Sequence, residues 1–363
     1  GINLSNQGGA GKLTTLFMRG SESDHVLVLV DGVRVGSSTS GLVSFQDLPV
    51  EQIERIEIVR GPRSSLYGSD AIGGVIQIFT RKDDGALRVR AHAGVGSDRT
   101  REAGFGLGAG GTRGWFGIDA NWNTTDGYNA CRGIGAPVFA GCFTTEPDRD
   151  GYENRSLSLR GGLRFGERAT LDLRALESRG ENDYDGSFVN RSDVVQQVLG
   201  AQFKWTASER FTLQATLGSN RDASDNFLGN VDQGDFDTRK DTASLQADWA
   251  AAEGQVLTVG ADWLRDRITS STAYDDTRRS NRAGFVQYQG AFGAHDLQLA
   301  VRRDDNGQFG GKTTGSAAWG VDVGGGFRLT ASWGTAFKAP SFNDLYFPFF
   351  GNPALRPEAS RTV

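Results

Sequence analysis

Aspartates gather in two stretches of the chain, where they are candidates for binding a hard cation. The acidic positions of the two stretches are Asp183, Asp185, Asp193, Asp222, Asp225, Asp232, Asp235 and Asp237. Carboxylates placed together without matching Lys or Arg repel one another unless water or a cation screens them, and calcium takes about six to eight oxygen ligands. A solvated acidic surface is the usual meaning of such a run. The residues alone therefore leave both interpretations open.

The only two cysteines, Cys131 and Cys142, fall in one predicted loop with Gly, Ala and Pro between them. In an oxidising compartment such a pair is expected to form a disulfide that restrains the loop. A metal site is the poorer interpretation, because two ligands without a nearby histidine are too few.

Patterns for other chemistry are weak. His25, His92 and His295 are isolated, with neither metal nor triad spacing, and are expected to be structural or surface residues. Residues 106–111 match a dinucleotide-binding glycine pattern by spelling, but they lie in alternating strand sequence that runs into a turn, not at a strand-to-helix junction. Neither a nucleophile elbow nor a catalytic pair of carboxylates stands out, so the sequence predicts that the chain is not an enzyme.

Composition is that of an ordinary soluble protein and excludes membrane-spanning helices, but it leaves one class of membrane protein open. Hydrophobic content is 37% and mean hydropathy is −0.40, and no run of 18 apolar residues occurs. A transmembrane β-barrel escapes this test, because only every second residue of a strand faces lipid. The 51 glycines and 8 prolines suit that class. A net charge of −5 gives no reason to expect a nucleic-acid partner.

From Gly85 onward, apolar and polar residues alternate with a period of two, as in Leu157, Leu159 and Leu163. About thirteen strands and the start of another are predicted. Short turns are predicted at 110–113, 166–169, 206–210, 251–255, 293–295 and 324–326, and longer loops at 124–152, 178–193, 220–237, 268–281, 303–312 and 338–360. Strict alternation of short and long connections is typical of an outer-membrane barrel, with its long loops on one face.

Before Gly85 the pattern is different. The apolar runs VLVLV (26–30) and VIQIF (75–79) are bounded by Gly, Asp and Ser, and they predict two buried strands of a small mixed sheet. Residues 50–58 between them are expected to pass from a helical turn into a strand. Gly61 and Pro62 then force a turn, and Gly73 with Gly74 marks a close approach of backbones.

The stretch from Arg60 to Ile78, preceded by LVLVDGV, resembles the plug domain of TonB-dependent outer-membrane receptors. The resemblance is carried chiefly by Arg60, Gly61, Pro62, Arg63, Tyr67, Gly68, Gly73 and Gly74. It implies an all-β fold: a transmembrane antiparallel β-barrel, of about 22 strands when complete, with a small N-terminal α/β plug domain. Residues 1–84 would be plug and residues 85–363 barrel, in the outer membrane of a bacterium.

Four segments, residues 2–20, 25–35, 304–310 and 335–358, are most similar to the cobalamin-transporting members of this family. The resemblance implies import of cobalamin or a related corrinoid, driven by a TonB-type partner. The cargo would rest on two polar apical loops of the plug, formed by Ser5, Asn6, Gln7, Lys12, Leu13 and Thr14 and by Ser37, Ser38, Thr39 and Ser40. It also raises calcium as the partner of the aspartates, with Asp183, Asp185, Asp193, Asp225, Asp232 and Asp235 as candidate ligands.

A ferric-siderophore receptor is the alternative function, because much of the plug and barrel pattern is shared. The plug disfavours a passive porin, and an additional role as a phage receptor stays open. The chain is expected to be part of a longer, monomeric protein in contact with lipid and lipopolysaccharide, with its TonB-binding segment before Gly1 and its closing strands after Val363.

Overall fold

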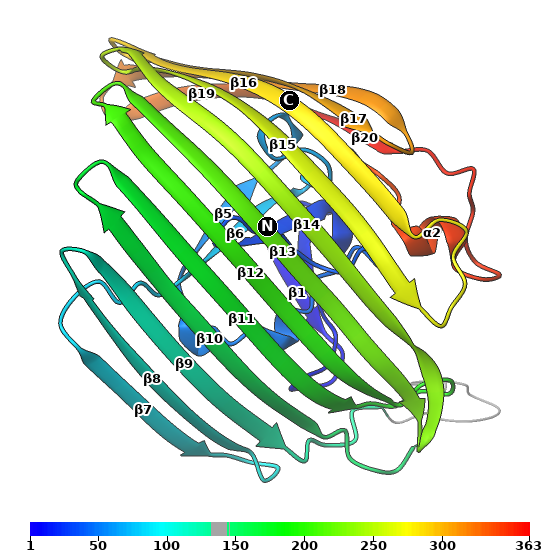
Figure 1. Ribbon diagram of the computed structural model, residues 1–363. Coiled ribbons are helices and arrows are strands. Elements are labelled where there is room, and N and C mark those ends of the chain that lie inside the picture. The colour runs from blue at the N-terminus through cyan, green and yellow to red at the C-terminus, as the bar shows by residue number, and fades with distance from the viewer. Residues whose placement is uncertain (132–143, 145) are drawn as a thin grey trace.

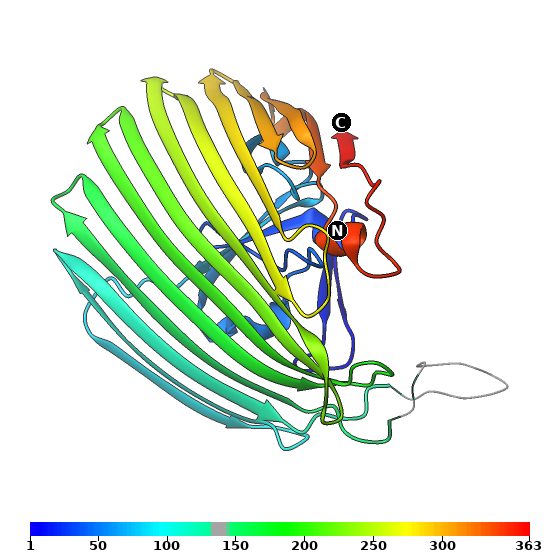
Figure 2. The ribbon, with the colours of Figure 1, turned by 45° about the vertical axis from the view of Figure 1, so that its right-hand side comes forward.

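The computed structural model describes residues 1–131, 144 and 146–363 of the chain. It consists of a curved antiparallel sheet, called the wall here, and a plug formed by residues 1–84 that lies against the concave side of the wall (Figures 1 and 2). The first strand of the wall begins at Arg88, and the division at residue 84 stays a prediction.

The wall contains 14 strands in sequence order, and each pairs antiparallel with its neighbours in the chain. The strands are β7 (Arg88–Val95), β8 (Arg101–Gly111), β9 (Gly114–Thr125), β10 (Tyr152–Phe165), β11 (Ala169–Asp183), β12 (Arg191–Ser208), β13 (Phe211–Leu228), β14 (Val231–Ala252), β15 (Gln255–Ser270), β16 (Arg278–Phe292), β17 (His295–Asn306), β18 (Gly310–Gly324), β19 (Phe327–Lys338) and β20 (Glu358–Thr362). β7 and β20 form the two edges of the sheet. The predicted thirteen strands and the start of another are confirmed.

All six predicted short turns join consecutive strands, and they share one end of the wall because every pairing is antiparallel. Two predicted long loops are wrong. Residues 220–237 belong to β13 and β14, which meet in a tight hairpin at Gly229, and residues 303–312 belong mostly to β17 and β18. At the end of the wall opposite the short turns, these strands carry polar residues on both faces. The alternation of apolar and polar residues therefore disappears there, while the backbone ladder continues.

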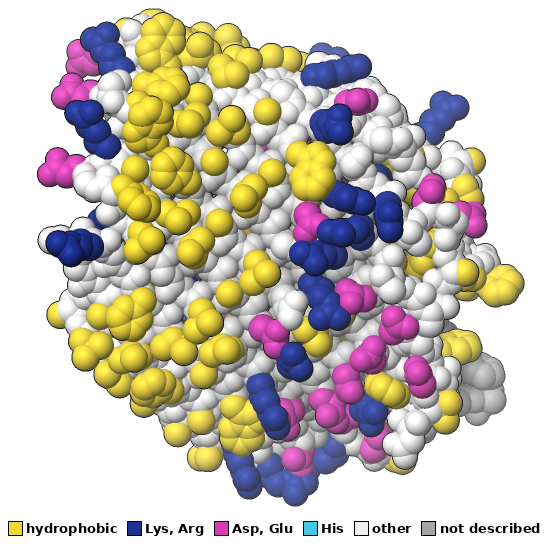
Figure 3. All heavy atoms as spheres, viewed as in Figure 1, with side chains coloured by type: hydrophobic (Ala, Val, Ile, Leu, Met, Phe, Trp, Pro, Cys, Tyr) yellow, Lys and Arg dark blue, Asp and Glu magenta, His cyan; other side chains and the backbone are white. Residues whose placement is uncertain are grey.

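The wall places its apolar side chains on the convex face. Figure 3 shows hydrophobic side chains gathered over the part of the wall nearest the short turns, with Lys, Arg, Asp and Glu over the part nearest the long loops. Leu159, Leu217 and Val301 belong to this outer set and are 47%, 60% and 52% exposed. An apolar belt bordered by charge is the surface that a bilayer requires of a barrel.

The plug has its own small sheet, in the order β4–β3–β6–β5. β3 (Val26–Val30) runs parallel to β6 (Gly74–Thr80), and β4 (Val33–Val35) and β5 (Ile53–Arg60) pair antiparallel to them. A hairpin of β1 (Ile2–Asn6) and β2 (Thr14–Met18) packs beside this sheet. The two predicted buried strands, and the helical turn η3 (Val50–Gln52) before β5, are confirmed.

No helix in the described part of the chain has the length and apolar character needed to cross a membrane.

Candidate functional site

Polar contacts hold the plug in the wall. Asp47, in the 3₁₀ helix η2 (Phe45–Asp47), accepts a hydrogen bond of 2.9 Å from the Tyr152 hydroxyl at the start of β10. The Asp31 carboxylate, after β3, lies 3.3 Å from Nε of Arg174 in β11. Hydrogen bonds and ion pairs from the inner face of the wall therefore help to hold the plug in place.

The second predicted apical loop is among the most buried parts of the plug. Ser37, Ser38 and Thr39 are each less than 9% exposed. The Ser38 hydroxyl donates to Asp266 of β15 over 2.8 Å, and the hydroxyls of Ser37 and Thr39 lie 2.7 Å apart. Only Ser40 is half-buried. In this structure the loop meets the wall, and contact with a cargo stays a prediction.

A short helix that the sequence analysis did not single out covers this loop. α2 (Phe342–Tyr346) follows β19, and its backbone amides at Phe342 and Asn343 donate to the carbonyls of Ser38 and Thr39 at 3.4 and 2.9 Å. Its N-terminus carries a capping box between Ser341 and Asp344. The Ser-x-x-Asp spacing before an apolar residue is a signal from which this helix could have been predicted.

The first predicted apical loop joins β1 to β2 and is open to solvent at Ser5, Asn6 and Gln7. The Asn6 side chain organises it: Oδ1 accepts from the amides of Gly8 and Gly9 at 3.0 and 2.6 Å, and Nδ2 donates to the Thr14 hydroxyl at 2.9 Å. A fixed loop with exposed polar groups can offer hydrogen bonds to a ligand without first being ordered.

Lys12, also predicted to touch cargo, is instead buried at 3% exposure. Its ammonium donates to the carbonyls of Asp150 and Gly151 and to Oδ1 of Asn182, at 3.0, 3.2 and 2.8 Å. Burial lowers the pKa of Lys12, while the carboxylates of Asp150 and Asp183 act in the opposite direction. Lys12 therefore fastens the first loop to the wall.

The RGP-type motif forms a turn and a short helix, α1 (Ser64–Tyr67), which docks on the wall. Ser65 lies 2.9 Å from the hydroxyl of Ser316, and the Leu66 carbonyl accepts from Arg302 at 3.3 Å. Arg302 is 1% exposed at its side chain and forms ion pairs with Asp262 and Asp304. Arg60 itself is exposed.

Two motif glycines are required by their surroundings. A Cβ on Gly68, whose φ is +77°, would lie 2.8 Å from Nη2 of Arg302. A Cβ on Gly74 would lie 2.3 Å from the Val59 carbonyl, because β5 and β6 are paired there. Tyr67 faces inward, and burial raises the pKa of its phenol. Its hydroxyl accepts a hydrogen bond of 3.0 Å from Gln77.

A cavity of about 420 Å³ separates the plug from the half of the wall nearest the short turns. Its lining combines polar groups with apolar side chains such as Phe79, Trp263 and Phe285. The polar members include Arg34, Tyr67, Gln77, Gln202, Gln214, Thr216, Ser244, Gln246 and Arg302. A polar space at this place leaves the plug incompletely packed against the wall on that side.

The aspartates proposed to bind calcium lie at the end of the wall opposite the short turns. Asp193, Asp225 and Asp235 occupy neighbouring positions on β12, β13 and β14. Asp185 follows β11, and burial raises its pKa, as do the carboxylates of Asp150 and Glu146. In the described ranges these residues do not form a group of three with ligand atoms close enough for one ion. Calcium binding by these aspartates stays a prediction.

One partner of the predicted disulfide, Cys142, lies outside the described residues. The pairing of Cys131 with Cys142 therefore also stays a prediction.

Family models match both parts of the chain. Residues 1–75 match the TonB-dependent receptor plug domain, and residues 90–363 match the TonB-dependent receptor-like β-barrel. The two matches meet close to the boundary between plug and wall.

Relatives of known name cover nearly all of the chain. It is 33% identical over 361 residues to a vitamin B12 transporter, BtuB, of Photobacterium profundum and 31% identical over 370 residues to BtuB of Vibrio cholerae. These alignments include 98% and 99% of this chain but only 57% and 58% of the relatives. The chain thus spans a little over half the length of these proteins.

Solved structures share the fold. The ferric enterobactin receptor PfeA of Pseudomonas aeruginosa superimposes with a TM-score of 0.81 at 20% identity, over 99% of this chain and 64% of that one. The siderophore receptor PirA of the same organism gives 0.73 at 24% identity, over 96% and 64%. These likenesses concern the fold alone.

Proposed function

Because the chain belongs to the TonB-dependent receptor family, we propose that the whole protein imports cobalamin or a related corrinoid with energy from a TonB-type partner. The protein lies in the outer membrane of a bacterium. The relatives are transporters by name, which supports a role without catalysis.

The observation that carries the cargo proposal is the pair of alignments, above 30% identity across plug and wall together, with relatives named vitamin B12 transporters. The plug adds physical support. Its exposed apical residues Ser5, Asn6 and Gln7 are uncharged hydrogen-bonding groups on a loop that Asn6 keeps ordered. A corrinoid offers many amides and little charge, so such a loop suits it better than a cluster of cations would.

The polar contacts between plug and wall support active transport. Each hydrogen bond between them is worth about 0.5 to 1.5 kcal/mol net, because water can replace it. A pulling partner can break such contacts one at a time, and the apolar contact to be given up includes Leu176 and Val198 of the wall. The polar cavity beside β6 supplies space on the side toward the short turns.

Equilibrium binding of cyanocobalamin and of a ferric siderophore to the full-length protein tests the cargo. We expect tight binding of cyanocobalamin and none of the siderophore. Gln7→Arg should weaken corrinoid binding by placing a bulky charge on the exposed loop, whereas Glu209→Arg, in an exposed turn at the opposite end, should not. Tight binding of the siderophore alone would replace the proposal with a siderophore receptor.

We further propose that calcium binds among the aspartates at the long-loop end. The raised pKa of Asp185, caused by its burial and by neighbouring carboxylates, reflects repulsion that a divalent cation would relieve. Lys12 supplies one positive charge to the same region. Chelation should lower cargo affinity and increase protease cleavage of these loops. Added calcium should restore the affinity and the resistance to protease. If chelation changes neither, the acidic surface is solvated without an ion.

A further inference from the structure

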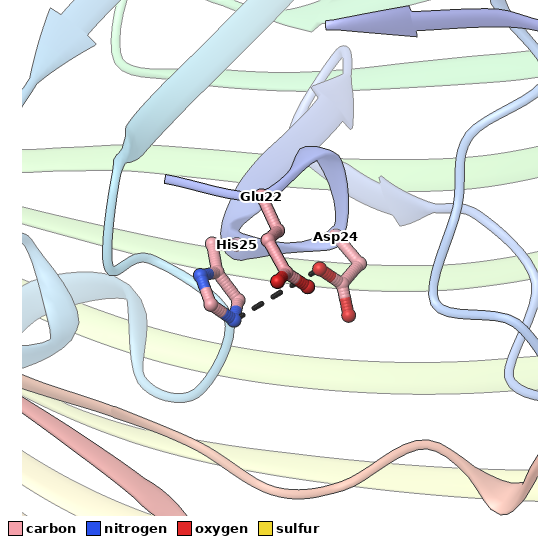
Figure 4. Close-up of side chains that lie close together, drawn as sticks. All are labelled: Glu22, Asp24 and His25. Atoms are coloured by element: carbon pink, nitrogen blue, oxygen red, sulfur yellow. Dashed lines mark ion pairs between the residues drawn. The ribbon is translucent and has the colours of Figure 1, made fainter. Parts of the chain in front are cut away.

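Three side chains just before β3 converge on one point. Glu22, Asp24 and His25 present ligand atoms that all lie within 4.8 Å of one another, and within residues 1–131, 144 and 146–363 they form the only such group of three. Figure 4 shows the two carboxylates and the imidazole pointing toward one another. They belong to the plug and lie apart from both predicted cargo loops in sequence.

The His25 imidazole supplies an independent reason to expect a ligand here. His25 is 8% exposed, and its Nε2 is buried without a hydrogen-bond partner. This nitrogen faces Oδ1 of Asp24 at 3.9 Å and Oε2 of Glu358 at 3.3 Å. A buried polar atom left unsatisfied is unfavourable by about 1 to 3 kcal/mol. A metal ion between these atoms would remove that cost, because the neutral nitrogen would become its ligand.

The wall contributes a fourth group. Glu358 is the first residue of β20 and lies opposite Lys338 of β19 in the strand register. The Lys338 ammonium contacts the other oxygen of Asp24, Oδ2, at 2.6 Å. Three carboxylates and one ammonium leave a formal charge of −2 around the imidazole. That charge matches a divalent cation, and the Lys338 contact leaves Asp24 Oδ1 available to it.

The donor set selects the class of ion. Imidazole nitrogen together with carboxylate oxygen suits zinc and its first-row neighbours, whereas calcium takes only oxygen ligands. Bonds of about 2.0 to 2.2 Å in a tetrahedral site place neighbouring ligand atoms roughly 3.3 to 3.6 Å apart. The separations from His25 Nε2 to Asp24 and Glu358 are 3.9 and 3.3 Å, and the ligand atoms of Glu22, Asp24 and His25 lie within 4.8 Å of one another. The carboxylate side chains must therefore move closer together to reach this geometry when the ion binds.

We propose that Glu22, Asp24, His25 and Glu358 bind a divalent transition-metal ion of the zinc class. The ion would fasten the plug segment before β3 to strand β20 of the wall. It would add a metal-dependent attachment to the hydrogen bonds that hold the plug elsewhere. This proposal does not depend on which cargo the protein carries.

Zinc titration of the full-length, metal-stripped protein by calorimetry tests the site, with cobalt absorption spectra as a second readout of nitrogen and oxygen ligation. We expect one zinc ion per chain at this site. His25→Gln and Glu22→Gln should each weaken its affinity by about 10-fold or more, since loss of even an outer partner of a ligand weakens binding by about 10- to 100-fold. Glu22 is exposed, so its variant should fold even if the His25 variant does not.

His92→Gln is the matched control, because it removes an exposed imidazole on β7 and should leave zinc affinity unchanged. Equal zinc affinity in the wild-type protein and in the Glu22 variant would overturn the site. Glu358→Gln tests the attachment to the wall. This variant should bind zinc more weakly, and in the presence of zinc its plug should be cleaved by protease faster than the wild-type plug. Unchanged zinc affinity in that variant would overturn the attachment.

Discussion

Strand β3 of the plug and strand β13 of the wall differ in how their side chains are buried. All five residues of β3, Val26 to Val30, are buried, and they form the centre of the plug's apolar clusters. β13 alternates: Leu217 points outward and is 60% exposed, while Asn220 points inward and is fully buried. Its inward side chain donates to the Gly36 carbonyl of the plug at 3.2 Å.

The comparison teaches where each part obtains its stability. The plug has a small apolar core, to which Leu176 of β11 and Val198 of β12 also contribute from the wall. The wall relies on a continuous backbone ladder and on lipid around its outer face. Many of the contacts between the two are polar, and water can replace these, while Leu176 and Val198 of the wall pack on the plug core. A plug that docks largely through polar groups is suited to controlled release.

The largest expected effect comes from a charge placed in the plug core. Val28→Asp buries a carboxylate at a position that is 1% exposed, which should disrupt the plug at a cost of several kcal/mol. Limited proteolysis should show rapid digestion of residues 1–84, while the heat-modifiable band of the folded barrel persists.

The matched variant Val286→Asp places the same charge on the outer face of the wall. It should lower barrel stability by roughly 1 to 2 kcal/mol and leave the plug protected, because an outward carboxylate in a barrel costs less than the about 2 to 4 kcal/mol of Arg or Lys. Digestion of the plug in this variant and not in Val28→Asp would reverse the comparison.

The next effect concerns the interface. Arg302→Met removes the guanidinium between Asp262 and Asp304, whose carboxylates would then lie close together without it. Breaking a buried ion pair in this way costs about 3 to 5 kcal/mol. We expect release of α1 and faster proteolysis near Tyr67. Arg303→Met is the control: this exposed neighbour donates a hydrogen bond to Thr313 on the wall and, among the described residues, none to the plug, so the plug should stay protected. Equal proteolysis of both variants would contradict this.

Sequence reasoning reached the strand count and the six short turns, because both follow from local patterns of apolar and polar residues. It missed the length of β13 and β14, where residues polar on both faces hide a strand outside the lipid zone. It also missed Arg302 and Asp304 as partners of α1. Their inward direction follows from the alternation with Leu299 and Val301, but their partner is set by how the plug docks, which no local pattern encodes.

The sequence likewise did not reveal that Ser37 to Thr39 and Lys12 are buried. A Gly- and Ser-rich loop has the same composition whether it faces water or a polar wall. What distinguishes the two is the presence of Asp266, Asn182 and the Asp150 carbonyl, which are separated from the loops by more than 130 residues.

A pH-dependent effect follows from Asp47, in the plug face that meets β10. Burial raises its pKa to about 7 from 3.8. A raised pKa means that the docked state binds the proton more tightly, so this group's contribution to docking is fully present below about pH 4 and is lost as pH rises through 7. At about 1.4 kcal/mol per pKa unit the loss is at most about 4 kcal/mol.

Asp47→Asn removes the charge and keeps an oxygen for the Tyr152 hydroxyl. Plug protection measured by proteolysis should be similar for the two proteins near pH 5, and better for the variant at pH 8. The same pH dependence in both proteins would show that Asp47 is not the group responsible.

The smallest expected effect separates docking from cargo binding at the second apical loop. Ser38→Ala removes one hydrogen bond to Asp266, which retains Lys240 at 3.9 Å and Arg279 at 3.8 Å. Docking of the plug should weaken by about 0.5 to 1.5 kcal/mol. Cyanocobalamin affinity should change by less than about tenfold, since one such bond is worth no more than this.

Ser40→Ala provides the control, because the Ser40 hydroxyl accepts a hydrogen bond from the amide of Leu42 within its own loop and, in the part of the chain that the structure describes, has none to the wall. If Ser38 serves the wall alone, its loss should speed hydrogen exchange in residues 36–41 more than the loss of Ser40 does, with similar cargo affinity in the two variants. A fall in affinity well beyond tenfold for Ser38→Ala, with unchanged exchange, would mean that this hydroxyl leaves Asp266 for the cargo. The polar contacts of the plug would then serve binding as well as docking.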